Sequence, residues 1–238
     1  INLESLKRKS IAGLLTDRQQ VSNELQGIKF EPRELPPTAE LITAEHPRHV
    51  GYLRDRCAPA DYPFMTVIEN DGVHWTRPQI VIPFTYNNEI VGYSSRMLDN
   101  RGPKYINDIQ PGYVFGTDLQ QDSWQHVLVM EGVFDALAIS GLAVLHAEVN
   151  DAQVKLIRSL GKEITVVPDQ DEAGMKLVDR AVELGWHVSM PNWPAGVKDV
   201  NDAVVKLGKL ATLLTIMQAK ETSRIKIEMQ RKKIIKNV

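Results

Sequence analysis

Between residues 126 and 210, short apolar runs alternate with amphipathic stretches of helical period. The apolar runs predict strands at 127–130, 143–146, 163–167 and 186–190. The stretches between them predict helices near 133–140, 151–160, 172–184 and 200–207. Strands and helices that alternate in this way fold as a parallel sheet with right-handed crossovers. We therefore expect an α/β domain over residues 126–210.

Turn and cap residues support the predicted helix boundaries. A glycine follows each of the four predicted helices, where a left-handed C-cap is common; these are Gly141, Gly161, Gly185 and Gly208. Asn150 with Gln153 predicts a capping box at one helix start, and Asp199 predicts an N-cap at another.

The first half of the chain has a different pattern. Residues 1–60 are polar and helix-like but are interrupted at Pro36-Pro37, so we expect a helical or linker segment with one short helix at 46–56. Residues 61–125 are strand-rich and predict a smaller, basic, mixed α+β subdomain. In it, two apolar runs flank Asn87-Asn88, which predicts a hairpin because asparagine tolerates positive φ.

The last section, residues 211–238, predicts a basic helical tail. Its residues 219–238 carry seven lysines and arginines against two glutamates, and isoleucines at a helical spacing form a partly apolar face. A solvated helix would have this pattern, and so would a helix that docks on a partner or on nucleic acid.

Composition narrows the class of protein. The chain has 238 residues, 43% of them hydrophobic and 24% charged, with a net charge of -2, so any nucleic-acid contact must come from local basic surface. The single cysteine, Cys57, excludes an intramolecular disulfide framework and a multi-cysteine zinc module, and it indicates a reducing compartment. The chain opens on Ile1 rather than Met, and we expect it to be a piece of a longer protein.

Carboxylates follow the predicted strands of the α/β domain. Glu131 and Asp135 come after the first strand, Asp169 and Asp171 after the third, and Asp199 with Asp202 after the fourth. Because the carboxyl ends of parallel strands meet at one edge of the sheet, these side chains should lie close together. Crowded carboxylates repel one another unless cations neutralise them, which predicts a divalent-metal site. Loop solvation or N-capping is the alternative, and for Asp202 a place in the first helical turn is equally consistent.

Two of these motifs resemble signatures of the Toprim fold. They are Glu131-Gly-x-x-Asp135-Ala-Leu and Asp169-x-Asp171-x-Ala-Gly. The segment from Ile82 through Arg96 to Pro103-Lys104-Tyr105-Ile-Asn resembles the one that precedes Toprim in DnaG-type primases. The element Gly196-Val-Lys198-Asp199-Val-Asn-Asp202 is similar to one in phage and plasmid primases. The resemblance covers residues 48–208, about two thirds of the chain.

The resemblance implies the RNA polymerase core of a DNA primase, which joins ribonucleoside triphosphates on a single-stranded DNA template with Mg²⁺ or Mn²⁺. It implies catalytic roles for Glu131, Asp135, Asp169 and Asp171, with Glu131 as metal ligand or general base. Metal ligands would be Glu131, Asp169, Asp171, Asp199 and Asp202. Nucleotide or DNA contacts would come from Arg96, Lys104, Tyr105 and Lys198, although a packed loop tyrosine or an ordinary surface cation remains the alternative reading for these.

Relatives of this kind usually also carry a zinc module and a helicase or helicase-binding region. One cysteine cannot build the zinc module, and the sequence contains no P-loop motif, so both would be partners absent from this chain. We expect a phage or plasmid primase acting in the cytoplasm of a bacterial or phage-infected cell. A Toprim nuclease and a non-catalytic binding module derived from a primase remain the alternatives.

Overall fold

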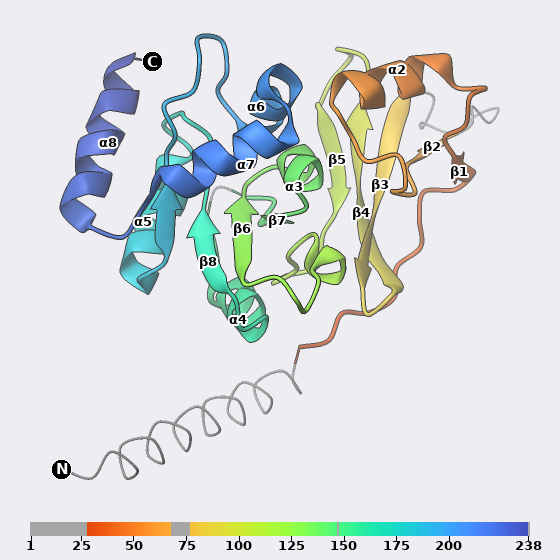
Figure 1. Ribbon diagram of the computed structural model, residues 1–238. Coiled ribbons are helices and arrows are strands. Elements are labelled where there is room, and N and C mark those ends of the chain that lie inside the picture. The colour runs from red at the N-terminus through yellow and green to blue at the C-terminus, as the bar shows by residue number, and fades with distance from the viewer. Residues whose placement is uncertain (1–27, 68–76, 147, 238) are drawn as a thin grey trace.

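The computed structural model describes residues 28–67, 77–146 and 148–237, which contain two five-stranded sheets set side by side (Figure 1). In the first sheet the strands follow one another in chain order: β1 (Ala39–Leu41), β2 (Met65–Val67), β3 (Gln79–Tyr86), β4 (Glu89–Met97) and β5 (Tyr105–Asp108). All its strand pairs are antiparallel. This sheet and α2 (Pro47–Asp55) form a mixed α+β part that starts before residue 61, because β1 and α2 lie in the segment predicted to be helical or a linker.

The predicted hairpin joins β3 and β4. Asn87 and Asn88 have φ values of 53° and 64°, so both central residues of the turn are left-handed, as the asparagine pair predicted. The helix expected at 46–56 is α2, which starts at Pro47. Proline suits the first position of a helix, because the backbone N–H that it lacks has no partner within the helix there. Residues 1–27 of the predicted N-terminal segment lie outside the described residues, and the part that follows contributes β1 and α2.

The second sheet has the order β10-β9-β8-β6-β7. Its parallel strands are β6 (His126–Met130), β7 (Leu142–Ala143), β8 (Glu163–Val166) and β9 (His187–Ser189). Its crossover helices are α3 (Val133–Ile139), α4 (Asp151–Ser159) and α5 (Met175–Leu184), and α6 (Val200–Leu207) follows the last parallel strand. The α/β class and the strand–helix alternation predicted from the sequence are therefore confirmed, although β7 is shorter than the predicted strand at 143–146.

The cores of the two sheets meet along β6. Leu128 and Met130 face one cluster, which contains residues of the first sheet, α3, α6 and α7 (Lys209–Gln218). Val127 and Val129 face the opposite cluster, formed with α4, α5 and α8 (Arg224–Asn237). This alternation is the period of two that a strand buried on both faces must have. The contacts of Leu128 and Met130 with this first cluster hold the first sheet beside the carboxyl edge of the second sheet.

Helix caps are mostly as predicted, with one difference. Asn150 and Gln153 form the capping box of α4, and Asp199 accepts the Asp202 N–H as the N-cap of α6. At the end of α3 the left-handed residue is Ser140, with φ 59°, rather than Gly141. A Cβ at Gly141 would lie 2.8 Å from the Leu128 carbonyl oxygen, so this glycine allows the close approach of α3's end to β6 instead.

The basic tail differs from the single helical segment predicted. It contains the end of α7, the two-residue strand β10 (Lys220–Glu221), which pairs antiparallel with β9, and α8. Two charged residues carry no strand periodicity, so only tertiary pairing reveals β10. On α8, Ile227 is buried and Ile234 packs on the same core, while Ile225 and Met229 are exposed.

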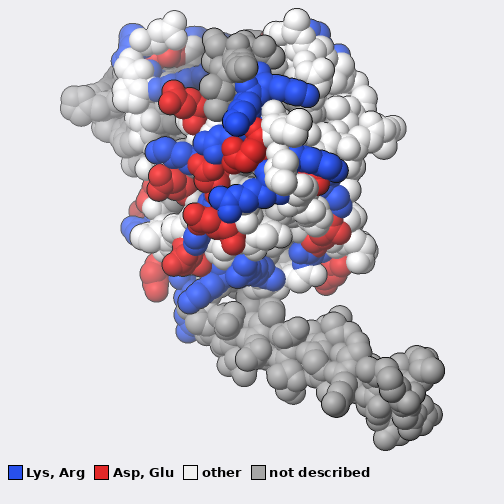
Figure 2. Space-filling view, turned by 90° about the vertical axis from the view of Figure 1, so that its left-hand side faces the viewer, with Lys and Arg blue, Asp and Glu red and all other residues white. Residues whose placement is uncertain are grey.

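Three of the seven basic residues of the tail have acidic partners in the part of the chain that the structure describes. Arg231 donates to Asp179 at 2.5 Å, Lys226 pairs with Glu221 at 3.0 Å, and Lys220 pairs with Glu163. Figure 2, which views this side of the molecule, shows lysines and arginines interspersed with aspartates and glutamates. The tail therefore does not form a patch of one sign on this face. Among the described residues, no helix is long and apolar enough to cross a membrane.

Candidate active site

A cleft of about 410 Å³ lies between the two sheets, at the carboxyl ends of the parallel strands. Acidic residues enter it from the second sheet: Glu131, Asp135, Asp169, Asp199 and Asp202. Arg56, Lys104 and Tyr105 enter it from the first sheet and the end of α2, and Lys198 adjoins Asp199. The cleft thus brings together eight of the ten residues named in the sequence analysis and places opposite charges across it.

Glu131 lies directly after β6 and is only partly exposed. Its Oε1 atom is buried and has no hydrogen-bond partner among the described residues. Burial, followed by the charges of Asp169 and Asp171, raises the pKa of Glu131 to about 7. A buried carboxylate oxygen without a donor is costly, so this atom is suited to a cation or a proton.

Asp169 follows β8 and faces Glu131 across the start of α5. Burial, then Asp199 and Asp171, raise the pKa of Asp169 to about 6. Because residue 174 is glycine, the backbone carbonyl of Asp169 and the carboxylate of Glu131 can both approach the same turn. A Cβ there would meet the Asp169 carbonyl oxygen at 2.2 Å and Glu131 Oε1 at 2.9 Å, so a larger residue would force the turn open.

Asp171 is placed differently from the other carboxylates. Its Oδ1 accepts the Gly174 N–H at 2.9 Å, its residue is exposed, and it does not line the cleft. It therefore caps the turn into α5, which is the alternative reading of an Asp-x-Asp pair. Its charge still contributes to the raised pKa values of Glu131 and Asp169, so it lies at the margin of the acidic edge.

Asp135 is the most deeply buried of the acidic residues, with 8% exposure in the first turn of α3. Its Oδ1 accepts the backbone N–H of Asn201 at 2.8 Å. Burial raises the pKa of Asp135 well above its ordinary value, and Asp199 and Asp169 raise it further. The hydrogen bond from Asn201 does not offset the burial of Asp135 and its repulsion by the other aspartates. The charged form of Asp135 therefore needs nearby positive charge to stabilise it.

Asp199 combines capping with a place in the cleft. Its Oδ1 accepts the Asp202 N–H at 2.7 Å, and burial raises its pKa despite that bond. Asp202 lies in the first turn of α6 and also lines the cleft. Both readings of Asp202 therefore describe its position.

The donor set fits a hydrated magnesium or manganese ion. No three His, Cys, Asp or Glu side chains of the described residues converge closely enough to hold an ion by themselves. Mg²⁺ usually keeps several waters and takes only one or two protein carboxylates, completed by substrate phosphates. Glu131 has a buried carboxylate oxygen without a hydrogen-bond partner among the described residues, and the pKa values of Glu131 and Asp169 are raised. Both features fit that pattern, because a bound cation would stabilise the charged carboxylates.

Arg96 lies outside the cleft, unlike the other predicted basic residues. Its guanidinium carbon is 4.8 Å from the Tyr105 ring centroid and 5.7 Å from that of Tyr52. Within the described part of the chain, its Nε and Nη1 atoms are buried without a hydrogen-bond partner. Arg96 lines an adjoining cleft of about 530 Å³ together with Arg48 and Lys104. Tyr105 thus has Arg96 on one face and lines the acidic cleft.

The sequence analysis gave no site role to Arg56, and it included Asn201 only as a member of the Gly196–Asp202 element. Arg56 ends α2, where a cation reads as ordinary surface charge, yet it reaches into the cleft. Burial alone would lower its pKa, but Tyr52, Asp199 and other neighbours outweigh that effect and raise it. Asn201 is 1% exposed and bonds to Arg56. No local pattern relates these residues, because 145 positions separate them.

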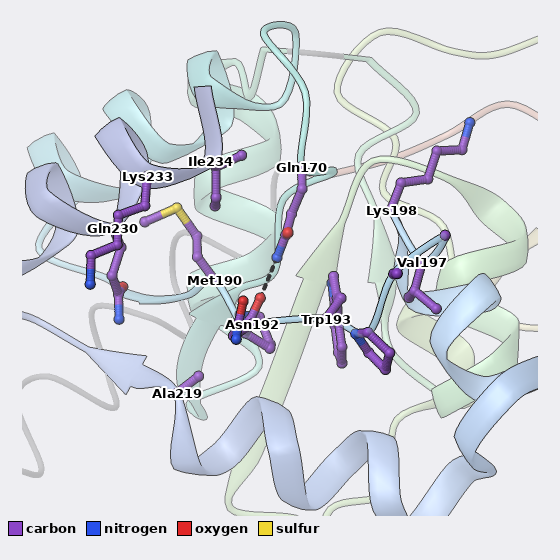
Figure 3. Close-up of a pocket in the computed structure, with 14 residues that line it drawn as sticks. Gln170, Met190, Asn192, Trp193, Val197, Lys198, Ala219, Gln230, Lys233 and Ile234 are labelled. Carbon is purple, nitrogen blue, oxygen red and sulfur yellow. Dashed lines mark hydrogen bonds between the residues drawn. The ribbon is translucent and has the colours of Figure 1, made fainter. Parts of the chain in front are cut away.

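A larger cavity of about 880 Å³ lies behind the acidic edge, between the loop 190–198 and α8 (Figure 3). Gln170, which separates Asp169 from Asp171, braces this loop: its side-chain Nε2 donates to the Pro191 carbonyl at 2.5 Å, and its backbone N–H donates to the Lys198 carbonyl at 3.1 Å. In Figure 3 the Lys198 side chain points away from the cavity. The loop that lines this cavity is therefore held to the acidic edge by Gln170, and Lys198 lines both cavities.

Comparison with known proteins relates this geometry to a family. A Toprim-like family model matches residues 128–204. A DNA primase of Clostridium acetobutylicum is 24% identical over 162 residues, which cover 60% of this chain and 27% of that protein. The chain thus spans about a quarter of the length of the curated relative.

Solved structures share the fold. The structure of the DnaG catalytic core superposes with a TM-score of 0.60 at 19% identity, covering 74% of each chain. A DnaG primase catalytic domain bound to single-stranded DNA superposes with a TM-score of 0.57 at 18% identity, covering 74% of this chain and 75% of that one. The chain is therefore similar in sequence to DnaG-type DNA primases, with a Toprim-like match in residues 128–204, and it shares the fold of the DnaG catalytic core.

Proposed function

We propose that this chain is the catalytic core of a DNA primase, which joins ribonucleoside triphosphates into a short RNA primer on single-stranded DNA. The observation that carries the proposal is the cleft itself, where five carboxylates face Arg56, Lys104 and Lys198. Triphosphates and divalent cations need such a pairing of charges, whereas a core serving only as a scaffold has no use for buried carboxylates of raised pKa.

Glu131 and Asp169, with Asp171, Asp199 and Asp202 around them, would hold Mg²⁺ or Mn²⁺. When bound, the ions would neutralise phosphate charge and favour ionisation of the attacking hydroxyl. Arg56, Lys104 and Lys198 would bind and orient the triphosphate, and the Tyr105 ring could stack on a base. Arg96 would act through Tyr105 or bind phosphate in the adjoining cleft.

The proposed reaction is nucleotidyl transfer. The primer 3′ oxygen forms a bond to the α-phosphorus, the bond between that phosphorus and the α–β bridging oxygen breaks, and pyrophosphate leaves with that oxygen. As a general base instead of a metal ligand, Glu131 Oε1 would accept the hydroxyl proton, because burial and the neighbouring aspartates raise the pKa of Glu131 to about 7. Asp135 would support the acidic edge from beneath rather than touch the primer, since it is almost fully buried.

Single-stranded DNA is proposed as the template, which the similarity to a DnaG catalytic domain bound to single-stranded DNA supports. A separate zinc module and a replicative helicase would be further partners, as part of a phage or plasmid primase in a bacterial or phage-infected cell. We expect the core alone to extend primers but to initiate them poorly. Strong template-specific initiation by this chain alone would contradict that expectation.

The test is primer extension with labelled ribonucleotides, Mg²⁺ or Mn²⁺, and a short RNA primer on a DNA template. Asp169→Ala should lower extension about 10²- to 10³-fold, since it removes a carboxylate that would hold the metal ion. Asp122→Ala, an exposed carboxylate outside the cleft, is the matched control and should extend like the parent chain. Metal-dependent template cleavage without extension would instead indicate a Toprim nuclease, and neither activity with no Mn²⁺ binding would indicate a binding module.

A further inference from the structure

Asn201, on the acidic side of the cleft, bonds directly to the end of α2. It is the second residue of α6, it is 1% exposed, and both polar atoms of its side chain are used. Its Oδ1 accepts Arg56 Nη1–H at 2.9 Å, and its Nδ2 donates to the Arg56 carbonyl at 2.7 Å. A single side chain therefore holds one residue of the first half of the chain at two points.

The backbone of the same residue reaches the acidic edge. The Asn201 N–H donates to Asp135 Oδ1 at 2.8 Å. Asp199, two residues earlier, caps the same helix and lines the cleft. Asn201 thus joins three parts of the site: the end of α2, the start of α6 and the buried carboxylate of α3.

Only an amide of this length suits the position. Arg56 presents a donor, its guanidinium, and an acceptor, its carbonyl, and asparagine supplies the complementary acceptor and donor. An aspartate could not donate to the carbonyl and would add a further charge to an edge where repulsion already raises pKa values. The Arg56 carbonyl is also a helix-end acceptor that needs a partner, because α2 ends there.

The hydrogen bond between Asn201 and Arg56 fixes the position of the Arg56 guanidinium. Arg56 is half-buried and close enough to Asp199 and Asp202 for their charges to raise its pKa, and its guanidinium carbon is 5.8 Å from the Tyr52 ring centroid. An arginine with free rotamers on a helix end would turn to solvent. Held by Asn201, it projects into the cleft beside the carboxylates.

We propose that Asn201 is a positioning residue that fixes the Arg56 guanidinium for the triphosphate. The inference rests on the proposed function. A guanidinium held at one point can form two parallel bonds to phosphate oxygens, whereas a mobile one must be ordered during binding. Asn201 therefore acts on the substrate only through Arg56.

A double-mutant cycle between Asn201→Ala and Arg56→Ala tests the inference. We expect Asn201→Ala to reduce primer extension about 10- to 100-fold, mainly as a raised KM for the ribonucleotide, because its loss displaces Arg56. The double variant should be no worse than Arg56→Ala alone, since coupled residues are not additive. Asn192→Ala, an exposed asparagine on the neighbouring loop, is the matched control and should leave extension unchanged.

A second variant keeps the test decisive if Asn201→Ala does not fold, as judged by far-ultraviolet circular dichroism. Arg56→Lys retains the charge but cannot reproduce the guanidinium's fixed fork, so it should raise KM nearly as much as Arg56→Ala. Arg54→Lys, on the exposed side of the same helix, is its control. Losses that multiply in the double variant, or an Arg56→Lys chain with parental KM, would overturn the inference.

Failure of the proposed function gives a different result. Binding of ATP with Mn²⁺, measured by calorimetry on the same variants, provides a second readout that does not require turnover. A parent chain that extends primers and binds ATP while Asn201→Ala does both equally well overturns the positioning role alone. A parent chain that does neither overturns the proposed function and this inference with it.

Discussion

The two cavities that meet at Lys198 differ in size and in chemistry, and the smaller one is the proposed active site. The larger, of about 880 Å³, is lined by residues such as Met190, Trp193 and Ile234. The smaller, of about 410 Å³, contains buried carboxylates whose pKa values are raised. Apolar side chains that line a cavity contribute to the stability of the fold. Buried carboxylates that repel one another destabilise the fold, so their presence indicates a function. Charge arrangement, rather than volume, therefore identifies the site.

The sharpest way to test this comparison is one substitution in each cavity. Glu131→Gln removes the proposed proton acceptor and metal ligand while conserving shape. It should reduce kcat for primer extension by about 10²- to 10⁴-fold, the usual contribution of a general base. Lys233→Ala, in the wall of the larger cavity, should leave kcat within about twofold, because surface changes away from a site have small effects. Equal losses in both variants would remove the distinction between the cavities.

Divalent cations should stabilise the acidic cleft in a pH-dependent way. Burial and neighbouring charges raise the pKa of Glu131 to about 7 and of Asp169 to about 6, from ordinary values of 4.5 and 3.8. Across pH 4–7 the folded chain thus binds more protons than the unfolded chain, so these two groups make stability fall as pH rises through that window. At pH 8 both are charged, and a cation relieves their repulsion.

Thermal unfolding with and without Mg²⁺ measures this effect. At a hundred times Kd, binding adds about 2.7 kcal/mol, which corresponds to a rise in Tm of about 5–10 °C at pH 8 for a chain of this size. The rise should be clearly smaller at pH 5, where protons compete for the same oxygens, and in Asp169→Ala at either pH. An increase in Tm independent of pH and of Asp169 would place the ion elsewhere.

The smallest predicted effect lies outside both cavities. Asn150→Ala removes the capping box of α4 and should lower the free energy of unfolding by about 1 kcal/mol, as for other N-cap substitutions. Primer extension should remain at the parental level, because α4 packs in the cluster that faces away from the first sheet. Denaturant titration and extension on the same sample separate the two quantities, and a parallel loss of activity would show that the cleft depends on α4.

Much of the fold could be predicted from the sequence because its signals are local. The strand–helix alternation of residues 126–210, the Asn87-Asn88 turn and the Asn150–Gln153 capping box each depend on a few neighbouring residues. The gathering of carboxylates was also predictable, since parallel strands carry their carboxyl ends to one edge. The catalytic, metal and nucleotide roles of those residues stay predictions.

Tertiary structure decided what no local pattern records. Arg56 contacts Asn201, which lies 145 positions later in the chain. Arg96 packs on the ring of Tyr105 instead of lining the acidic cleft, and Asp171 caps a turn. Tertiary structure also formed β10 from two charged residues that only pairing with β9 makes a strand. The physical reason is the range of the interactions. Periodicity and capping are set within a turn or two of chain, whereas the position of a charged side chain depends on which distant element packs against it and on what offsets its burial.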